Sequence, residues 1–231
     1  MRSIAIITAR GGSKRIPKKN IISFCGKPII AYSIKAAIGS GLFDEVMVST
    51  DSEEIAEVAK QYGAKVPFLR SKKTSDDYST TVDVIKEVLC EYKKQGISFD
   101  LFACIYPTAP FLTDDILRDA MKKMESLGAE SLVPVTQFSF PPQRAFVIRE
   151  GFLRYVFPEY EKARSQDLEP LYHDCGQFYL CTCEALNKYG SLITPNVVPY
   201  IITEERVQDI DNMSDLAIAE AKYKVLEAKR G

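Results

Sequence analysis

Residues 3–20 read SIAIITARGGSKRIPKKN, an apolar run that ends abruptly in a basic loop with two glycines. A continuous apolar run such as residues 3–8 is typical of a buried parallel strand. The loop that leaves the carboxyl end of such a strand is where open α/β sheets bind ligands. Gly11 and Gly12 allow backbone N–H groups to approach phosphate oxygens closely. The same loop carries five cations with no acid between them: Arg10, Lys14, Arg15, Lys18 and Lys19.

This combination predicts a polyphosphate-binding loop, and the alternative is a basic turn that faces water. Two common phosphate-binding patterns are absent from the loop, namely G-x-x-x-x-G-K-[ST] and G-x-G-x-x-G, so a dinucleotide-dependent oxidoreductase is not supported. The formal net charge of the chain is −1, and no overall field would attract nucleic acid or a membrane surface. The positive charge is local, which suits a small anionic ligand.

Length and cysteine content indicate the class of protein. The 231 residues suffice for one α/β domain with a sizeable core, and we expect a single domain over residues 1–231. None of the six cysteines forms a C-x-x-C pair, which argues against a zinc site. We find no signal peptide and no long apolar span, so the sequence indicates a cytoplasmic protein whose thiols stay reduced.

The chain continues with alternating strand and helix patterns. Apolar runs predict strands at 45–50, 66–69, 100–106 and 131–135. Helical spacing and capping signals predict helices at 29–38, 51–62, 82–95 and 113–127. Pro67 places the strand that contains it at a sheet edge. The alternation predicts a right-handed doubly wound α/β sheet, which strands at 177–181 and 196–203 and a helix at 214–229 complete.

Residues from about 137 to 172 interrupt this alternation. Two β-like runs, 145–149 and 152–157, flank Glu150-Gly151 and predict a β-hairpin that leaves the main sheet. An isolated hairpin buries its apolar face poorly, so pairing with a second subunit is a natural use for it, and a decorated monomer is the alternative.

Asp209 and Asp211 flank Ile210 near the end of the chain. Residues two apart in an extended segment point to the same side, so Ile210 would face the core and both carboxylates a cleft. Mg²⁺ is commonly held by one or two carboxylates together with phosphate oxygens and water. The alternative is that Asp211 starts a turn before the last helix and Asp209 is solvated.

Two further groups of polar residues have competing interpretations. Arg70, Asp77, Thr80 and Thr81 follow a predicted strand and precede a predicted helix. They suit base and ribose recognition, but ordinary helix capping explains them equally and is preferred from residue type alone. His173 is the only histidine, and we interpret it as a hydrogen-bonded structural residue rather than a catalyst.

Three motifs in order resemble a known family. Residues 9–20 resemble the opening signature of the CMP-sugar synthetases that activate nonulosonic acids. Residues 107–110, PTAP, resemble the PTSP turn of that family, and residues 209–211, DID, resemble its metal-binding D-x-D motif. The resemblance spans nearly the whole chain. It implies a Rossmann-like fold of the nucleotide-diphospho-sugar transferase type, a homodimer built through the excursion at 137–172, and Mg²⁺-dependent use of CTP.

Within this family, residues 164–167 (RSQD) and 172–179 (YHDCGQFY) are most similar to the pseudaminic acid branch. The sialic acid branch usually has Gln before PTSP, where this chain has Tyr106, and Arg after the Leu that follows PTSP, where this chain has Leu112. It also usually has Gly-Ala where this chain has Gly176-Gln177. The resemblance therefore implies transfer of CMP from CTP to the anomeric hydroxyl of pseudaminic acid, with release of pyrophosphate. Sialic or legionaminic acid as the acceptor, or a non-catalytic nucleotide-binding dimer, are the alternatives.

The resemblance and the patterns above together give the candidate site residues. The catalytic candidates are Arg10, Lys19 and Asp211, and the metal candidates are Asp209 and Asp211. The nucleotide-binding candidates are Ala9, Arg10, Gly11, Gly12, Ser13, Lys14, Lys19, Asn20, Arg70, Asp77, Thr80 and Thr81. The candidates for the sugar acid are Tyr106, Thr108, Arg164, Gln166, His173, Gln177 and Tyr179, of which Arg164 and Gln166 would reach it from a partner subunit.

Overall fold

The structure is a computed structural model that describes residues 1–76 and 78–229. Its main strands are β1 (Ser3–Thr8), β4 (Glu45–Ser49), β5 (Leu101–Ile105), β6 (Ser131–Gln137), β9 (Tyr172–Asp174), β10 (Phe178–Thr182) and β11 (Val197–Ile201). Its helices are α1 (Ile30–Ser40), α2 (Glu53–Gln61), α3 (Thr81–Lys94), α4 (Asp114–Ser126), α5 (Cys183–Tyr189) and α6 (Met213–Ala228). No helix within these described ranges is long and apolar enough to cross a lipid bilayer.

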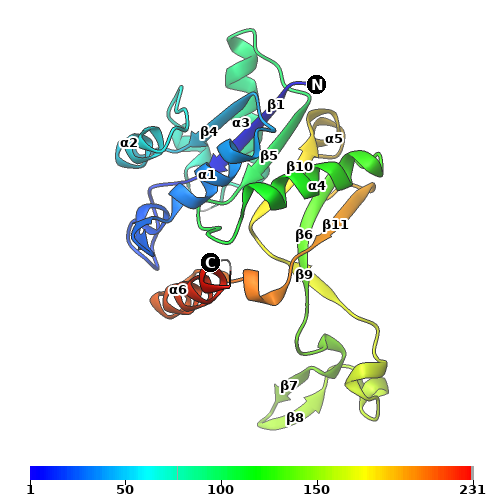
Figure 1. The fold of residues 1–231 in the computed structure, drawn as a ribbon. Helices are drawn as coiled ribbons and strands as arrows, with labels where there is room; N and C mark the ends of the chain where they lie inside the picture. Colours follow the sequence, from blue (N-terminus) through cyan, green and yellow to red (C-terminus); the bar gives the residue numbers. More distant parts are fainter. Residues whose placement is uncertain (77, 230–231) are drawn as a thin grey trace.

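These seven strands form one mixed sheet in the order β11-β6-β10-β5-β1-β4, with β9 added to β6 (Figure 1). Strands β4, β1 and β5 are parallel, and β11 is parallel to β6. Strand β10 runs antiparallel between β5 and β6. The carboxyl ends of β1, β4 and β5 therefore lie at one edge of the sheet, where ligands of open α/β sheets bind.

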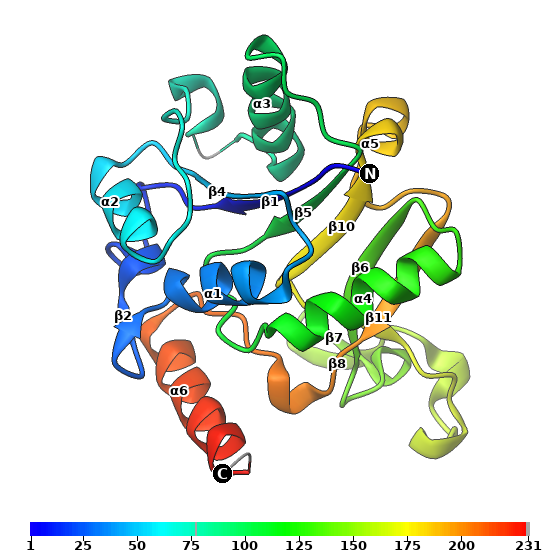
Figure 2. The same cartoon turned by 45° about the horizontal axis from the view of Figure 1, so that its top comes forward.

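Helices cover both faces of the sheet, and β1 shows why. Ala5 and Ile7 are fully buried in the cluster that includes residues of α1, α2 and α4. Ile4 and Ile6, which alternate with them, are buried in a second cluster with residues of α3 and α5. Because successive strand residues point to opposite faces, a continuous apolar run requires cover on both sides. Figure 2 shows the sheet between these two layers, which confirms the predicted three-layer α/β class.

A third buried cluster lies beside the sheet and connects the two ends of the sequence. Ile16 from the basic loop and Ile210 from the acidic segment are both about 1% exposed within it. Leu216 and Ala219 of α6 belong to the same cluster. Packing of these side chains brings the basic loop and the segment 209–211 together across nearly 200 positions of sequence.

The predicted strand at 66–69 is wrong. Only one residue nearby pairs with the sheet, since Lys65 makes an isolated bridge to Met47 of β4. Pro67 lacks the N–H that a ladder requires, and the chain leaves the sheet after this bridge. The edge strand of the sheet is therefore β4.

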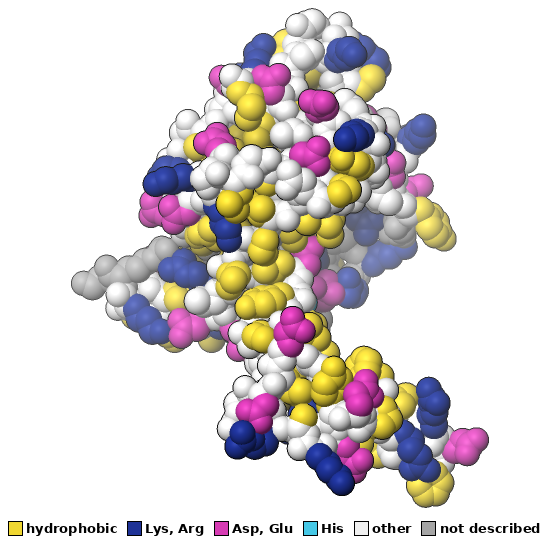
Figure 3. Space-filling model, turned by 90° about the vertical axis from the view of Figure 1, so that its right-hand side faces the viewer, with side chains coloured by type: hydrophobic (Ala, Val, Ile, Leu, Met, Phe, Trp, Pro, Cys, Tyr) yellow, Lys and Arg dark blue, Asp and Glu magenta, His cyan; other side chains and the backbone are white. Residues whose placement is uncertain are grey.

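The excursion contains the predicted hairpin, formed by β7 (Phe146–Arg149) and β8 (Phe152–Tyr155). Glu150 and Gly151 both have positive φ, 53° and 81°, as the common two-residue hairpin turn requires. The hairpin projects away from the sheet (Figure 1). Its apolar side chains stay exposed, with Ile148 at 72% and Phe152 at 62%. Hydrophobic side chains gather on this projecting part in the space-filling view (Figure 3).

Candidate active site

The candidate site consists of two adjoining cavities. The first, which we call cavity A, has a volume of about 490 Å³. It lies at the carboxyl ends of β1 and β5 and receives the basic loop on one side. Its lining residues are Thr8, Arg10, Ser13, Lys14, Arg15, Ile16, Lys19, Asn20, Arg70, Thr74, Asp76, Ser79, Thr81, Val84, Tyr106, Pro107 and Thr108. Most of the predicted nucleotide-binding residues thus share one cavity.

The basic loop is fastened to its neighbours by hydrogen bonds. The backbone N–H of Ala9 donates to Ser49 O at 2.9 Å, and Nδ2 of Asn20 donates to Arg10 O at 2.8 Å. The backbone N–H of Gly11 donates to Oδ1 of Asp51 at 2.7 Å. A Cβ atom on Gly11 would lie 3.1 Å from Cβ of Ser52, so only glycine fits this close approach without displacement. The loop is therefore held against the start of α2, and Ser13 lines cavity A.

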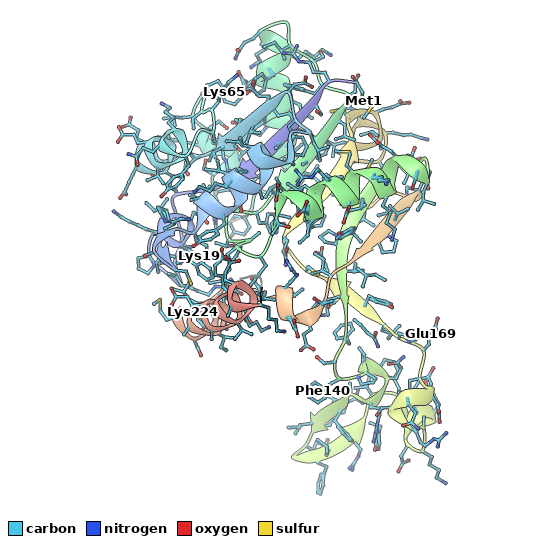
Figure 4. All side chains as sticks on the ribbon, in the orientation of Figure 1. Met1, Lys19, Lys65, Phe140, Glu169 and Lys224 are labelled. Atoms are coloured by element: carbon cyan, nitrogen blue, oxygen red, sulfur yellow. The ribbon has the colours of Figure 1, made fainter. Side chains whose placement is uncertain are left out.

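Two cations of the loop converge on the acidic segment. Nη1 of Arg15 lies 2.7 Å from Oδ2 of Asp211, and Nζ of Lys19 lies 3.5 Å from its Oδ1. The same Nζ donates to the carbonyl oxygen of Ile210 at 2.8 Å. Figure 4 shows Lys19 on the side of the molecule where α6 lies. The fold thus places the predicted phosphate-binding and metal-binding motifs in direct contact.

The acidic segment has the donor set that Mg²⁺ prefers. Ile210 is buried, so the neighbouring Asp209 and Asp211 side chains lie away from that core, as the spacing predicts. Within the part of the chain that the structure describes, no three His, Cys, Asp or Glu side chains gather to hold a metal ion. Two carboxylates therefore fit an ion that takes its other ligands from phosphate and water, and they do not fit a structural zinc site.

Shortening the buried anchor of this segment should destabilise the protein. We expect Ile210→Ala to lower the free energy of unfolding by about 2–5 kcal/mol, because a fully packed side chain leaves a cavity when truncated. The matched control is Ile218→Ala on α6, where the side chain is 46% exposed and the expected loss is only about 0.5 kcal/mol. Urea denaturation of both variants measures the difference, and equal losses would contradict the anchoring role.

The opposite side of cavity A is built around a buried arginine. Arg70 is 8% exposed, and its Nε and Nη2 donate to Oγ and O of Ser49 at 3.0 and 2.5 Å. Burial lowers the pKa of Arg70 below its ordinary value, while the neighbouring carboxylates of Asp51 and Glu87 oppose that change. Glu87 also accepts hydrogen bonds from the backbone and hydroxyl of Ser71. This network fixes a donor-rich wall that suits recognition of a polar ring.

The other residues of that predicted cluster separate into different positions. Thr81 lines cavity A, and its Oγ1 lies 3.2 Å from the hydroxyl of Tyr106. Thr80 is the N-cap of α3, in a reciprocal capping box with Asp83, and does not line the cavity. The ordinary capping interpretation therefore describes Thr80, and its nucleotide-binding role stays a prediction. Asp77 lies outside the described residues.

The second cavity, cavity B, has a volume of about 360 Å³ and adjoins cavity A. Its lining residues are Lys19, Tyr106, Thr108, Ala109, Pro110, Phe111, Asp174, Cys175, Gly176, Gln177, Tyr179, Gln208 and Asp209. Lys19, Tyr106 and Thr108 line both cavities. The ring centroids of Tyr106 and Tyr179 lie 5.7 Å apart in an edge-to-face contact. Tyr106, Thr108, Gln177 and Tyr179, all predicted for the sugar acid, thus lie together in cavity B.

Three predicted sugar residues line neither cavity in a single chain. His173 is exposed on β9, its ring centroid is 4.7 Å from that of Phe138, and its Nδ1 is 2.9 Å from Asp174 O. Arg164 and Gln166 lie on the excursion, where Arg164 pairs with Asp167 at 2.7 Å. The structural interpretation of His173 agrees with these contacts, while Arg164 and Gln166 would need a second chain to bring them to a cavity.

Sequence reasoning missed two acidic residues of the site. The sequence pattern indicates only a helix start at Asp51, but its Oδ1 accepts a hydrogen bond from the backbone of the basic loop. Asp174 lies within the segment 172–179 that carries the family resemblance, but its role depends on a hydrogen bond from Tyr179 that no spacing rule predicts. The one available signal for Asp51 was its position directly after the predicted strand at 45–50, whereas Asp174 is the last residue of β9, a strand that the patterns did not predict.

The sheet, the basic loop and the paired cavities define an α/β nucleotidyltransferase-type protein. A solved structure of CMP:2-keto-3-deoxy-manno-octonic acid synthetase complexed with CTP has the same fold, with a TM-score of 0.71, 16% identity and 100% of both chains covered. The family model described as cytidylyltransferase matches residues 4–146, and the chain therefore belongs to the cytidylyltransferase family.

Curated relatives agree over nearly the full length. The chain is 45% identical over 226 residues to a pseudaminic acid cytidylyltransferase of Campylobacter jejuni, covering 97% of each chain. It is 35% identical to a CMP-N,N'-diacetyllegionaminic acid synthase of Legionella pneumophila, covering 95% of each. These findings confirm the family that the three motifs indicate.

Proposed function

We propose that this protein transfers CMP from CTP to the anomeric hydroxyl of a nonulosonic acid, most specifically pseudaminic acid, and releases pyrophosphate. The observation that carries the proposal is the shared wall of the two cavities, formed by Lys19, Tyr106 and Thr108. A nucleotide in cavity A and a sugar acid in cavity B would meet at that wall. The relatives' names supply the identity of both substrates.

The reaction is a direct substitution at phosphorus. The oxygen of the sugar's anomeric hydroxyl bonds to the α-phosphorus of CTP, the bond to the bridging oxygen of pyrophosphate breaks, and the hydroxyl proton is released. Such transfers need mainly positioning and charge neutralisation. The backbone N–H group of Gly12 and the side chains of Arg10 and Lys19 would stabilise the negative charge on the departing pyrophosphate. Tyr106 and Thr108 would orient the acceptor beside it.

Asp209 and Asp211 would hold Mg²⁺, which fits their carboxylate chemistry. When bound, the ion supplies further neutralisation of charge on phosphate oxygens. Asp211 also accepts hydrogen bonds from Arg15 and Lys19, so it fixes the two cations of the loop relative to the acidic segment. The six free thiols fit a reducing cytoplasm as the site of the reaction.

A substrate panel scored by pyrophosphate release from CTP tests the proposal. We expect release with pseudaminic acid and weaker release with legionaminic and sialic acids. Equal or greater activity with sialic acid would move the assignment to that acceptor. CTP binding without pyrophosphate release for any acceptor would favour a non-catalytic nucleotide-binding dimer.

We also propose that the active form is a homodimer in which the excursion of each subunit reaches the cavity B of its partner. Apolar side chains of β7 and β8 lie exposed together, since Phe146, Ile148, Phe152 and Leu153 are each at least 50% exposed, and contiguous exposed apolar side chains commonly mark an interaction surface. Among the described residues that line cavity B, Lys19 is the only cation. A guanidinium such as Arg164 suits a sugar carboxylate because it binds both oxygens. Arg164 of a second copy would supply that group.

Mixing two inactive variants tests this arrangement. Asp211→Asn impairs the core of one subunit, and Arg164→Ala impairs its excursion. If the excursion acts on the partner, co-expression should restore about a quarter of the wild-type rate. Half of the randomly assorted dimers contain one copy of each variant, and each of these mixed dimers has one intact site out of two. If the excursion acts within its own chain, every site in the mixed dimer carries a defect. The absence of recovery would then contradict the proposed exchange.

A further inference from the structure

Asp174 at the end of β9 is an exposed carboxylate that lines cavity B. Two separate donors hold its oxygens in place. The hydroxyl of Tyr179 donates to Oδ2 at 2.6 Å, and the backbone N–H of Gly176 donates to Oδ1 at 2.7 Å. A carboxylate has about four lone-pair sites, so Asp174 retains the capacity to accept further hydrogen bonds.

Tyr179 keeps the Asp174 side chain in a defined orientation. Burial, and then the hydrogen bond to Asp174, raise the pKa of Tyr179 well above its ordinary value. The hydroxyl is therefore protonated throughout the neutral range and remains a donor. The Tyr179 ring is itself fixed by its edge-to-face contact with Tyr106, which lines both cavities. Asp174 is thus pre-organised as an acceptor.

Gln177 lines the same cavity, and its amide is fixed. Its side chain is 4% exposed, and its Nε2 donates to the carbonyl oxygen of Arg206 at 2.6 Å, which fixes the amide. Among the described residues, none lies within hydrogen-bonding distance of its Oε1. A buried acceptor without a partner is unfavourable, and such groups are commonly satisfied by a ligand or water. Asp174 is therefore the exposed acceptor of cavity B, and the Oε1 of Gln177 is buried in the wall behind it.

We propose that Asp174 recognises the hydrogen-bond donors of the acceptor sugar, its acylamino N–H groups or hydroxyls. This inference rests on the proposed function. The carboxylate of Asp174 suits this contact because hydrogen bonds to ionised acceptors are stronger than hydrogen bonds to neutral ones. Asp174 also repels the sugar's own carboxylate, whereas Lys19 attracts it. The sugar acid is thereby oriented with its acidic end toward Lys19 and its donor-bearing end toward Asp174.

The test is steady-state pyrophosphate release by Asp174→Asn, with pseudaminic acid varied at saturating CTP and then CTP varied at saturating sugar. The variant is nearly isosteric but exchanges one acceptor for a donor. We expect KM for the sugar acid to rise about 10- to 100-fold while KM for CTP stays within about 2-fold. Asp119→Asn is the matched control, because Asp119 is an exposed aspartate of α4 that lines neither cavity.

A second variant tests whether the orientation of the Asp174 carboxylate matters. Tyr179→Phe keeps the carboxylate but removes the donor that orients it, and we expect a smaller rise in the KM for sugar, about 3- to 10-fold. An unchanged KM for the sugar in Asp174→Asn would overturn the inference, and so would equal rises in the KM values of sugar and CTP. In either case, activity of the wild-type protein would leave the proposed function standing. Wild-type protein that releases no pyrophosphate with any nonulosonic acid would overturn both.

Discussion

Replacing Asp211 with asparagine should lower kcat/KM for pyrophosphate release by about 10³-fold or more, because the change removes a charge that, in the proposed metal-binding role, is worth several kcal/mol in the transition state. Asp211 lies where the acidic segment meets the basic loop, within hydrogen-bonding distance of Arg15 and Lys19. Loss of the carboxylate therefore also releases two cations from their arrangement. Steady-state kinetics at saturating Mg²⁺ measure the effect.

The fold should survive this replacement. The Asp211 side chain is partly exposed and its pair with Arg15 is open to water, so the expected change in unfolding free energy is about 1 kcal/mol or less. Glu205→Gln is the matched control, since Glu205 forms an exposed ion pair with Lys229 away from both cavities. Near-normal activity of Asp211→Asn in Mg²⁺ would exclude Asp211 as a metal-binding residue.

Lys19→Gln should lower kcat/KM for CTP by about 10²-fold or more, as expected when a group that neutralises transition-state charge is lost. Lys19 is the lysine that lines both cavities, and its Nζ is held by the carbonyl oxygen of Ile210. That position lies between the proposed sites of the leaving pyrophosphate and the sugar acid.

The adjacent lysine provides a control within the same loop. Nζ of Lys18 pairs with Glu54 at 2.7 Å, and Lys18 lines neither cavity. Lys18→Gln removes the same charge one position away, and it should change kcat/KM by only about 2-fold if position rather than net charge matters. Equal losses in Lys18→Gln and Lys19→Gln would show that the loop acts only through its overall charge.

The sequence predicted the layers of the fold because apolar periodicity is strong there. The run at 3–8 requires cover on both faces, and the structure buries Ile4 and Ile7 under different helices. Periodicity carries no information on strand direction, so the antiparallel course of β10 could not be predicted. The strands β2 (Ser23–Phe24) and β3 (Lys27–Pro28) have two residues each, which is too short for an alternating apolar pattern to be recognised in the sequence.

The candidate site was predictable where residues follow strands of the sheet directly. The basic loop after β1 and Tyr106 after β5 meet in cavity A because parallel strands end at one edge. The contact of Lys19 with Asp211 depends instead on packing of the third buried cluster, which spans both ends of the chain. Arg164 lies on the excursion and lines neither cavity, so its proposed contact with the sugar acid would need a second subunit.

A crystal structure of the protein with CTP and Mg²⁺ tests the central claim most directly. We expect the nucleotide in cavity A, with its phosphates against Gly12, Ser13 and Lys19 and a divalent ion at Asp209 and Asp211. The cytosine should lie on the side of the cavity formed by Arg70. A cavity A that stays empty at saturating CTP, or a nucleotide bound elsewhere on the molecule, would contradict the account.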